Sequence, residues 1–343
     1  REPLFAEIDN IKRAGVEIRC NQSLGKDFNI NDLFERDGFN AVVLAVGAHK
    51  SRKLGIAGEE KHGVMHGTDF LRQIALNQLT ATVQGKRVAV IGGGDVAIDA
   101  ARSAWRLGAS EVHLVYRRQR ADMPAHPEEI EAAEEEHTRF HFLANPVRVL
   151  GEEQVTGVVI QSQRLGEFDS SGRRKPVAVE NDEITLEIDL LIPAIGQTTD
   201  LDWKTDESIA TTRSSTFTVQ TAFDTTRAGV FAAGDAVSGP ATVVLAVAHG
   251  NLVAVEVDHW LQTGEIVKPH YETPRPDIEQ PYNLDDYATA RRPDIPMLTP
   301  AERAGNFNEV ETGFDEKTAQ EEAKRCLRCE LEWLDLMKIP RPQ

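Results

Sequence analysis

The chain has 343 residues, enough for about two domains, and an ordinary globular composition with 41% hydrophobic and 27% charged residues. A formal net charge of −17 argues against nucleic acid or an anionic membrane as partner, because both need a basic surface. Three cysteines are too few for a disulfide scaffold, and no apolar run approaches the roughly 20 residues that span a bilayer. The sequence therefore predicts a cytoplasmic protein without membrane insertion.

A dinucleotide-binding motif follows the second of the predicted strands. The first strand lies in GFNAVVLAVGA, residues 38–48, and the second is KRVAVI, residues 86–91, an apolar run typical of a buried parallel strand. A turn matching G-x-G-x-x-A, a helix at 96–107 and a strand at 111–116 come next. Glycines let the backbone approach a pyrophosphate, and the helix N-terminus offers free N–H groups. The predicted binding residues are Gly92, Gly93, Gly94, Asp95 and Val96.

The end of the strand at 111–116 bears on which pyridine nucleotide is bound. NAD sites usually place an acidic residue there, but this chain has Arg117 and Arg118. An arginine pair suits the 2′-phosphate of NADP. Solvated arginines, or arginines stacked on adenine, would instead be compatible with NAD, and the sequence leaves both open.

Three further segments complete the first 260 residues. The acidic stretch 127–137 predicts a helix with a solvated face, and the alternating runs from RFHFLA (139–144) to LLIPAIG (190–196) predict a small antiparallel addition ending in a return strand.

Residues 228–257 predict a strand, then Gly234-Asp235, then a long helix starting near Pro240. A carboxylate there could accept a hydrogen bond from a ribityl hydroxyl, and the helix dipole would stabilise a flavin edge. An ordinary strand and core helix is the alternative.

These stretches resemble a known family. VVLAVGA, VAVIGGGDVAIDAAR, VYRRQRADMPAHPEE, LLIPAIGQ and VFAAGDAVSGPATVVLAVAHG are similar, in order and spacing, to the glutamate synthase small-subunit family of NAD(P)H/FAD oxidoreductases. That family includes flavin subunits of ferredoxin:NADP and tungsten aldehyde oxidoreductase complexes. The resemblance implies an α/β fold of two Rossmann-like domains, with an NAD(P) domain inserted in an FAD domain. The implied ranges are 1–85 (partial FAD domain), 86–196 (NAD(P) domain), 197–264 (FAD domain return) and 265–343 (extended arm and CxxC helix).

The resemblance also implies the cofactors FAD and NAD(P). The binding residues expected in addition to the glycine turn and the arginines are Ala45, Val46, Gly47, Ala194, Ile195, Gly196, Gly234, Asp235, Ala241, Thr242 and Val243. Family members begin with a separate G-x-G-x-x-G unit for the ADP half of FAD, whereas this chain opens on REPLFAEIDNIKRAG. We expect the residues completing that site to lie upstream of Arg1, since a fold without its central strand would expose sheet edges. An incomplete FAD site is the alternative.

The C-terminal segment carries a cysteine pair. After a Pro-rich arm, a helix started by Asp315 or Thr318 is predicted to carry Cys326 and Cys329. With Cys20 these are too few for the four thiolates of an iron–sulfur cluster. The pair could donate metal ligands to a partner's cluster, serve only in docking, or act as a redox dithiol.

The predicted function is hydride transfer between NAD(P)(H) and FAD, coupled to single-electron transfer with iron–sulfur and catalytic partner subunits of an oxidoreductase complex. Expected complexes are tungsten or molybdenum aldehyde or formate oxidoreductases and ferredoxin:NADP oxidoreductase. The alternatives are a glutamate synthase small subunit, an assembly subunit that lost FAD, and a dithiol reductase. Hydride transfer itself needs no acid or base, so no catalytic side chain is predicted.

Overall fold

The computed structural model describes residues 2–79, 82–168, 172–204, 206, 208–268 and 291–323. The chain folds into two compact units. Unit 1 contains the described residues up to Lys50 and those from Gln197 to 268. Unit 2 contains the described residues from Ser51 to Gly196 together with 291–323.

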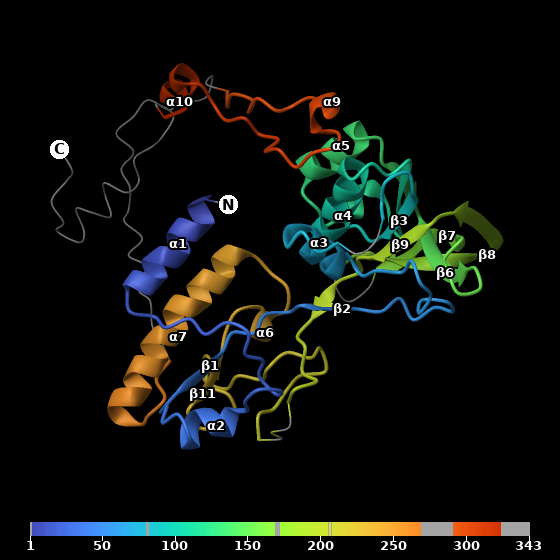
Figure 1. The fold of residues 1–343 in the computed structure, drawn as a ribbon. Helices are drawn as coiled ribbons and strands as arrows, with labels where there is room; N and C mark the ends of the chain where they lie inside the picture. The colour runs from blue at the N-terminus through green and yellow to red at the C-terminus, as the bar shows by residue number, and fades with distance from the viewer. Residues whose placement is uncertain are drawn as a thin grey trace. The chain divides into compact units, whose positions relative to one another are not determined.

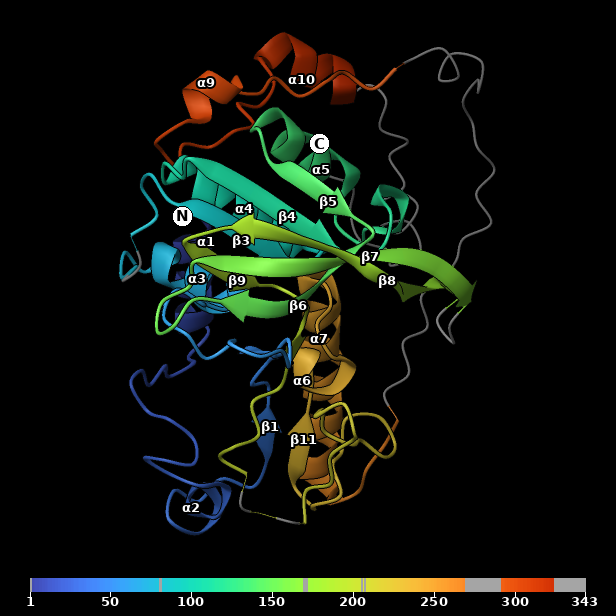
Figure 2. The ribbon, with the colours of Figure 1, turned by 90° about the vertical axis from the view of Figure 1, so that its right-hand side faces the viewer.

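Unit 2 is built on a four-stranded sheet in the order β5-β4-β3-β9 (Figure 2). All neighbouring strands are parallel, and their bounds are β3 (Arg87–Ile91), β4 (Glu111–Tyr116), β5 (Arg139–Phe142) and β9 (Leu190–Pro193). Helix α4 (Asp95–Arg106) connects β3 to β4. A short 3-10 turn, η1 (Arg120–Asp122), and α5 (Pro127–Glu135) connect β4 to β5. The predicted strand, turn, helix and strand are therefore confirmed.

Helices cover one face of this sheet, and a second sheet covers the other (Figure 1). Alternate residues of a strand point to opposite faces, so each strand contributes to two cores. The helical core joins Val88, Val90 and Leu114 to the alanines of α4 and to Phe70 of α3 (Gly67–Ala75). The opposite core joins Ala89, Ile91 and Val115 to side chains of the second sheet.

The second sheet is antiparallel, in the order β6-β7-β8, with β6 (Ala144–Leu150), β7 (Gly157–Phe168) and β8 (Arg174–Glu187). This confirms the antiparallel addition, with one correction. The run at 139–142, which the sequence analysis placed in that addition, forms β5 at the edge of the parallel sheet. The prediction was wrong because the chain returns through α5, and a strand that follows such a crossover pairs parallel to the strand before it.

Residues 51–79 also pack in unit 2, although the sequence analysis assigned 1–85 to a partial FAD-binding domain. Phe70 of α3 is completely buried in the helical core, and Val64 forms a parallel bridge with Leu191 of β9. The compact unit therefore begins at Ser51 rather than near residue 86. The assignment of cofactors to these ranges stays a prediction.

An arm of unit 2, residues 291–323, contains α9 (Pro300–Arg303) and α10 (Glu316–Ala323), and its α9 lies beside α5 (Figure 1). Helix α9 begins with a capping box between Thr299 and Glu302. Before α10, the Asp315 carboxylate accepts a hydrogen bond of 2.7 Å from the backbone N–H of Thr318, which confirms the predicted helix start. The predicted cysteine pair, Cys326 and Cys329, lies outside the described residues.

A buried charge cluster holds this arm against α4 and the end of α5. Glu136 is completely buried, and its carboxylate accepts two hydrogen bonds, of 3.0 and 3.1 Å, from Arg102 on α4. Arg303 of α9, only 3% exposed, donates to the same carboxylate at 3.2 Å and to the carbonyl of Leu298 at 2.7 Å. We call Arg102, Glu136 and Arg303 the arm clamp. Arg106 adds a third cation 3.6 Å from Glu136.

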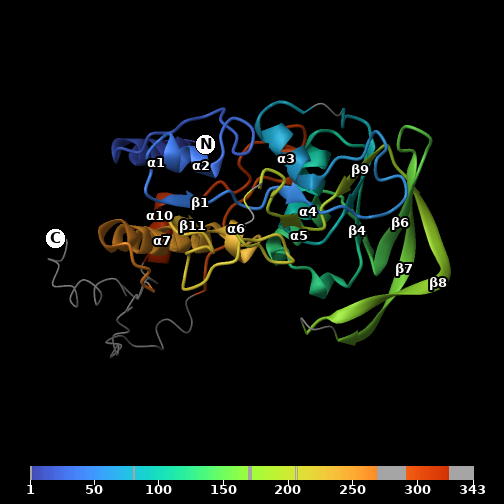
Figure 3. The ribbon, with the colours of Figure 1, turned by 90° about the horizontal axis from the view of Figure 1, so that it is seen from below.

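Unit 1 is centred on a parallel pair of strands, β1 (Val42–Leu44) and β11 (Val230–Ala232) (Figure 3). Two hydrophobic cores flank this strand pair. Helix α7 (Val243–Thr263) packs in one core, through Val253 with Phe231, and α2 (Ile30–Glu35) packs in the other, through Ile30. The other described elements of unit 1 are α1 (Glu2–Arg13), α6 (Asp235–Ser238) and β10 (Gln197–Thr198). Strand β2 (Lys50–Ser51), which pairs with β10, lies where the chain passes from one unit to the next. Both strands predicted for this region are confirmed.

Helix α7 starts at Val243 rather than near Pro240. The hydroxyl of Thr242 caps it by accepting a hydrogen bond of 3.3 Å from the N–H of Leu245. Among the described residues, no helix combines the length and the apolar composition needed to cross a bilayer.

Candidate functional site

The glycine turn of unit 2 is shaped by two close approaches. At Gly92, with φ of +150°, a Cβ atom would lie 2.3 Å from the carbonyl oxygen of Ala194, and at Gly93 it would lie 2.5 Å from the ring of Tyr116. Gly94, the N-cap of α4, has an extended backbone, and its nearest neighbour would be Pro124 at 3.8 Å. The turn thus brings bare backbone to the start of α4, where the first N–H groups of a helix have no intrahelical partner.

A second helix begins at the same edge of the sheet. A Cβ atom on Gly67, the first residue of α3, would lie 3.1 Å from both Ala194 and Val96. The N-termini of α3 and α4 therefore converge beside the end of β9, and both helix dipoles favour an anion there. Sequence reasoning missed α3, although glycine before the amphipathic run TDFLRQI was a usable signal.

The residues that follow β9, Ala194, Ile195 and Gly196, lie at this edge, and their contact with a nicotinamide stays a prediction. The N–H of Ala194 donates to the carbonyl of Ile91 at 2.7 Å, which fixes the end of β9 next to the glycine turn. Ile195 is 42% exposed, and Gly196 has a φ of +117°, in the region that favours glycine. An exposed apolar side chain at this place could contact a flat ring.

The two arginines after β4 have different surroundings. Arg117 is exposed. Arg118 is only 4% exposed, and its Nε donates to the carbonyl of Arg174 on β8 at 2.9 Å. The predicted pair is therefore divided, because one side chain is exposed and the other is buried. Arg117 is the member that solvent, and therefore a ligand, can reach.

A segment after η1 is fastened over the glycine turn. We call residues 122–126 the cover segment. The Tyr116 hydroxyl donates to the carbonyl of Asp122 at 2.7 Å, and the N–H of Ala125 donates to the carbonyl of Gly93 at 3.2 Å. The N–H of His126 donates to the carboxylate of Asp95 at 3.2 Å. Asp95, a predicted cofactor-binding residue, thus has a partner within the protein.

Burial shifts the pKa of several side chains. His113 and His141 stack on neighbouring strands with 2.9 Å between Nδ1 and Nε2, and burial lowers the pKa of both. In unit 1, burial raises the pKa of Glu256 on α7.

The predicted flavin residues of unit 1 gather at one edge of the strand pair. Because β1 and β11 are parallel, the segment Ala45-Val46-Gly47 and the segment Gly234-Asp235 follow their carboxyl ends side by side. Asp235 is half-buried, and among the described residues its carboxylate accepts no hydrogen bond. The start of α7 is exposed, including Ala241, Thr242 and Val243, which is 80% exposed. A carboxylate and a helix N-terminus are thus available to a ligand at this edge.

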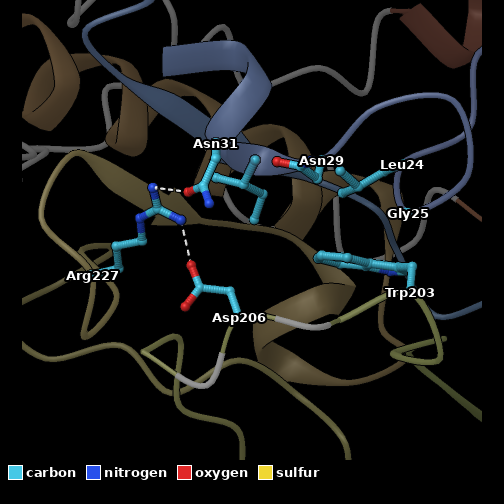
Figure 4. A pocket seen from close by; sticks show the side chains of 8 residues that line it. Leu24, Gly25, Asn29, Asn31, Trp203, Asp206 and Arg227 are labelled. Carbon is cyan, nitrogen blue, oxygen red and sulfur yellow. Dashed lines mark hydrogen bonds and ion pairs between the residues drawn. The ribbon is translucent and has the colours of Figure 1, made fainter. Parts of the chain in front are cut away.

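Unit 1 also contains a cavity of about 130 Å³ that the sequence did not indicate (Figure 4). Arg227 pairs there with Asp206 and donates to the side-chain oxygen of Asn31 at 2.7 Å. Gly25 permits the close approach of Trp203, since a Cβ would lie 2.3 Å from the Cβ of that tryptophan. These polar groups bind one another, which is typical of a structural cavity. No cluster of metal-ligating side chains occurs in the part of the chain that the structure describes.

Comparison with known proteins identifies several relatives. The chain is 41% identical over 347 residues to NADP(+)-dependent formate dehydrogenase subunit beta of Moorella thermoacetica, covering 96% of this chain and 47% of that protein. It is 38% identical over 369 residues to NADPH-Fe(3+) oxidoreductase subunit beta of Geobacter sulfurreducens (strain DL-1 / KN400), covering 96% and 54%. The chain therefore spans about half the length of these relatives.

Two further matches concern the resemblance to glutamate synthase small subunits and the fold. A putative glutamate synthase [NADPH] small chain of Cereibacter sphaeroides is 34% identical, over 78% of this chain and 67% of that protein, which confirms the resemblance found in the sequence. FprA from Mycobacterium tuberculosis has a similar structure, with a TM-score of 0.59 at 19% identity, covering 72% of this chain and 70% of that one. This likeness supports the fold class.

The family description "Pyridine nucleotide-disulphide oxidoreductase" matches residues 7–250, which is more than half of the chain. The match agrees with the two parallel sheets, the glycine turn before α4 and the α/β fold class expected from the sequence. The chain belongs to the pyridine nucleotide-disulphide oxidoreductase family.

Proposed function

We propose that this chain binds NADP(H) in unit 2 and FAD in unit 1, and that it serves as the electron-transfer subunit of a larger oxidoreductase with iron–sulfur and catalytic partners. The observation that carries the proposal is the glycine turn, where bare backbone meets the start of α4. The relatives from Moorella thermoacetica and Geobacter sulfurreducens, which align with 96% of the chain, are named as beta subunits of an NADP(+)-dependent and an NADPH-dependent enzyme.

In unit 2 the pyrophosphate of the nucleotide would lie against Gly92, Gly93 and Gly94, with the N–H groups of Asp95 and Val96 as donors. Arg117 is the exposed cation at the end of β4, which suits the 2′-phosphate of NADP. The residues Ala194, Ile195 and Gly196 would border the nicotinamide. These residues bind and orient the nucleotide, and none of them needs to move a proton.

In unit 1 the free carboxylate of Asp235 suits a ribityl hydroxyl, and the capped start of α7 suits the electron-rich edge of a flavin. Ala45, Val46 and Gly47 would border the same ligand. Flavin, when bound, supplies the chemistry that divides a hydride into single electrons. This step is what an NADPH-dependent subunit needs when its partners carry one electron at a time.

A glutamate synthase small chain is the second candidate, and coverage argues against it. The small chain of Cereibacter sphaeroides aligns with 78% of this chain, whereas the two beta subunits align with 96%. The additional aligned length favours a role like that of the beta subunits. Two other possibilities are an assembly subunit without FAD and a dithiol reductase that uses Cys326 and Cys329. The following experiment distinguishes both from the proposal.

The test is an absorption spectrum of the purified full-length subunit, followed by addition of NADPH without oxygen. We expect a flavin band that bleaches with NADPH and returns when a one-electron acceptor such as ferricyanide is added. Substituting Cys326 and Cys329 by serine should leave both responses intact. A preparation that has no flavin and does not bind added FAD would support the assembly subunit. NADPH-dependent reduction of an added disulfide that the wild type carries out and the serine variant loses would support the dithiol reductase.

A further inference from the structure

The cover segment is attached to the glycine turn through a side chain of α4. Asp95 is the first residue of that helix, and one oxygen of its carboxylate accepts the hydrogen bond from the backbone N–H of His126. His126 in turn is the N-cap of α5 and has no side-chain capping bond. Asp95 therefore connects the starts of α4 and α5, the two helices that flank the turn.

The hydrogen bond between His126 and Asp95 holds the C-terminal end of the cover segment, since the other contacts hold residues that precede His126. The Tyr116 hydroxyl holds the carbonyl of Asp122, and the N–H of Ala125 holds the carbonyl of Gly93. Met123 and Ala125 are buried in the helical core. Between them, Pro124 is the closest neighbour of the space beside Gly94. The cover segment is thus a wall of the space into which a pyrophosphate would enter.

The negative charge of Asp95 bears on the role of this residue. A carboxylate in the first turn of a helix lies close to where the helix would bind an anion, so it would repel a pyrophosphate. A carboxylate that only stabilised the helix dipole would not need a hydrogen-bond partner. Here the carboxylate is engaged by a backbone N–H of the wall, which gives it a structural task that an uncharged acceptor could also perform.

We propose that Asp95 is a positioning residue for the nucleotide: its carboxylate latches the cover segment beside the glycine turn and so fixes one wall of the pyrophosphate site. The inference rests on the proposed NADP(H) binding in unit 2. It assigns the carboxylate of Asp95 to the wall, while the backbone N–H of Asp95 keeps its proposed role as a donor to the pyrophosphate.

The experiment compares Asp95→Ala, Asp95→Asn and the matched control Asp99→Ala, which removes a carboxylate one turn further along α4. The full chain is used in each case. Amide hydrogen exchange of residues 122–126 is measured without nucleotide, and NADP⁺ binding is measured by titration calorimetry. Steady-state oxidation of NADPH then gives KM and kcat.

We expect Asp95→Ala to raise exchange in the cover segment and to weaken NADP⁺ binding by about fivefold, as loss of a hydrogen bond of ordinary strength predicts. KM should rise with it while kcat stays within about twofold, because the wall affects binding and not hydride transfer. Asp95→Asn keeps an oxygen acceptor and loses the charge. It should restore slow exchange and bind NADP⁺ at least as tightly as the wild type.

Two results would overturn the proposal. One is unchanged exchange and binding in Asp95→Ala, and the other is equal loss in Asp95→Asn and Asp95→Ala, which would make the charge and not the latch the important property. A wild-type chain that binds no NADP⁺ would overturn the proposed function and the positioning role together. In that case normal exchange in Asp95→Asn and fast exchange in Asp95→Ala would still separate a failed function from a failed latch.

Discussion

Replacing Arg303 by methionine tests how the arm is held to unit 2. The substitution keeps most of the apolar stem and removes the guanidinium, which is 3% exposed and bonds to Glu136, Glu135 and the carbonyl of Leu298. Breaking a buried ion pair costs about 3–5 kcal/mol when one charge is left unpaired. Glu136 keeps its two hydrogen bonds to Arg102, so we expect a smaller loss, about 2–3 kcal/mol.

For a unit of this size that loss lowers the melting temperature by about 5–10 °C. Scanning calorimetry of the full chain measures it, and limited proteolysis reports whether residues 291–323 become cleavable before the rest of the unit. The control is Arg120→Met, whose ion pair with Glu134 is 43% and 41% exposed and should contribute little. If Arg303→Met and the control melt at the same temperature, the arm clamp does not hold the arm, and the reasoning from burial fails.

Three further predictions concern unit 2. Gly94→Ala should fold normally, because its backbone is extended and its surroundings are open, yet weaken NADP⁺ binding by about tenfold or more in calorimetry, since a methyl group would replace bare backbone. Arg117→Ala should raise the KM for NADPH and leave that for NADH unchanged, whereas Arg118→Ala should lower the melting temperature without changing that preference. Burial lowers the pKa of His113 and His141, so the unfolded chain takes up protons first, and stability should fall as the pH drops below their ordinary value of 6.5. His141→Gln should make that fall shallower in melting curves between pH 7.5 and 5, and an unchanged slope would contradict the assignment.

The local features of unit 2 could be predicted because they depend on short stretches of sequence. An apolar run, three glycines and a small-residue helix determine β3, the turn and α4 with little help from distant residues. The same holds for the capped start of α10, where Asp315 and Thr318 are three residues apart.

Features that depend on distant residues could not be predicted. The acidic segment 127–137 was interpreted as a helix with a solvated face, but Glu136, next to its end, is completely buried because Arg303 reaches it from 167 residues away. The sequence analysis treats Arg117 and Arg118 as a pair because they are adjacent, and only the position of β8 shows that Arg118 bonds within the protein while Arg117 is exposed. The cover segment was missed for the same reason, since a bond between Asp95 and the N–H of His126 leaves no pattern in the sequence.

The place where unit 2 begins determines how this protein can be recombined with its relatives. A chimera joined at residue 86, just before the strand that leads into the glycine turn, would take α3 and α4 from different parents. Phe70 of α3 would then be separated from the core that surrounds it. Junctions at Ser51 and Gly196 instead exchange the parallel sheet with all of its covering layers. The arm clamp adds a third requirement, because Glu136 and Arg303 then come from different parents unless residues 291–323 are transferred as well. With NADP(H) bound in unit 2 as proposed, a transfer of coenzyme preference needs two pieces of chain, residues 51–196 and 291–323. An exchange of the first piece alone leaves the buried carboxylate of Glu136 paired with the arm of the recipient.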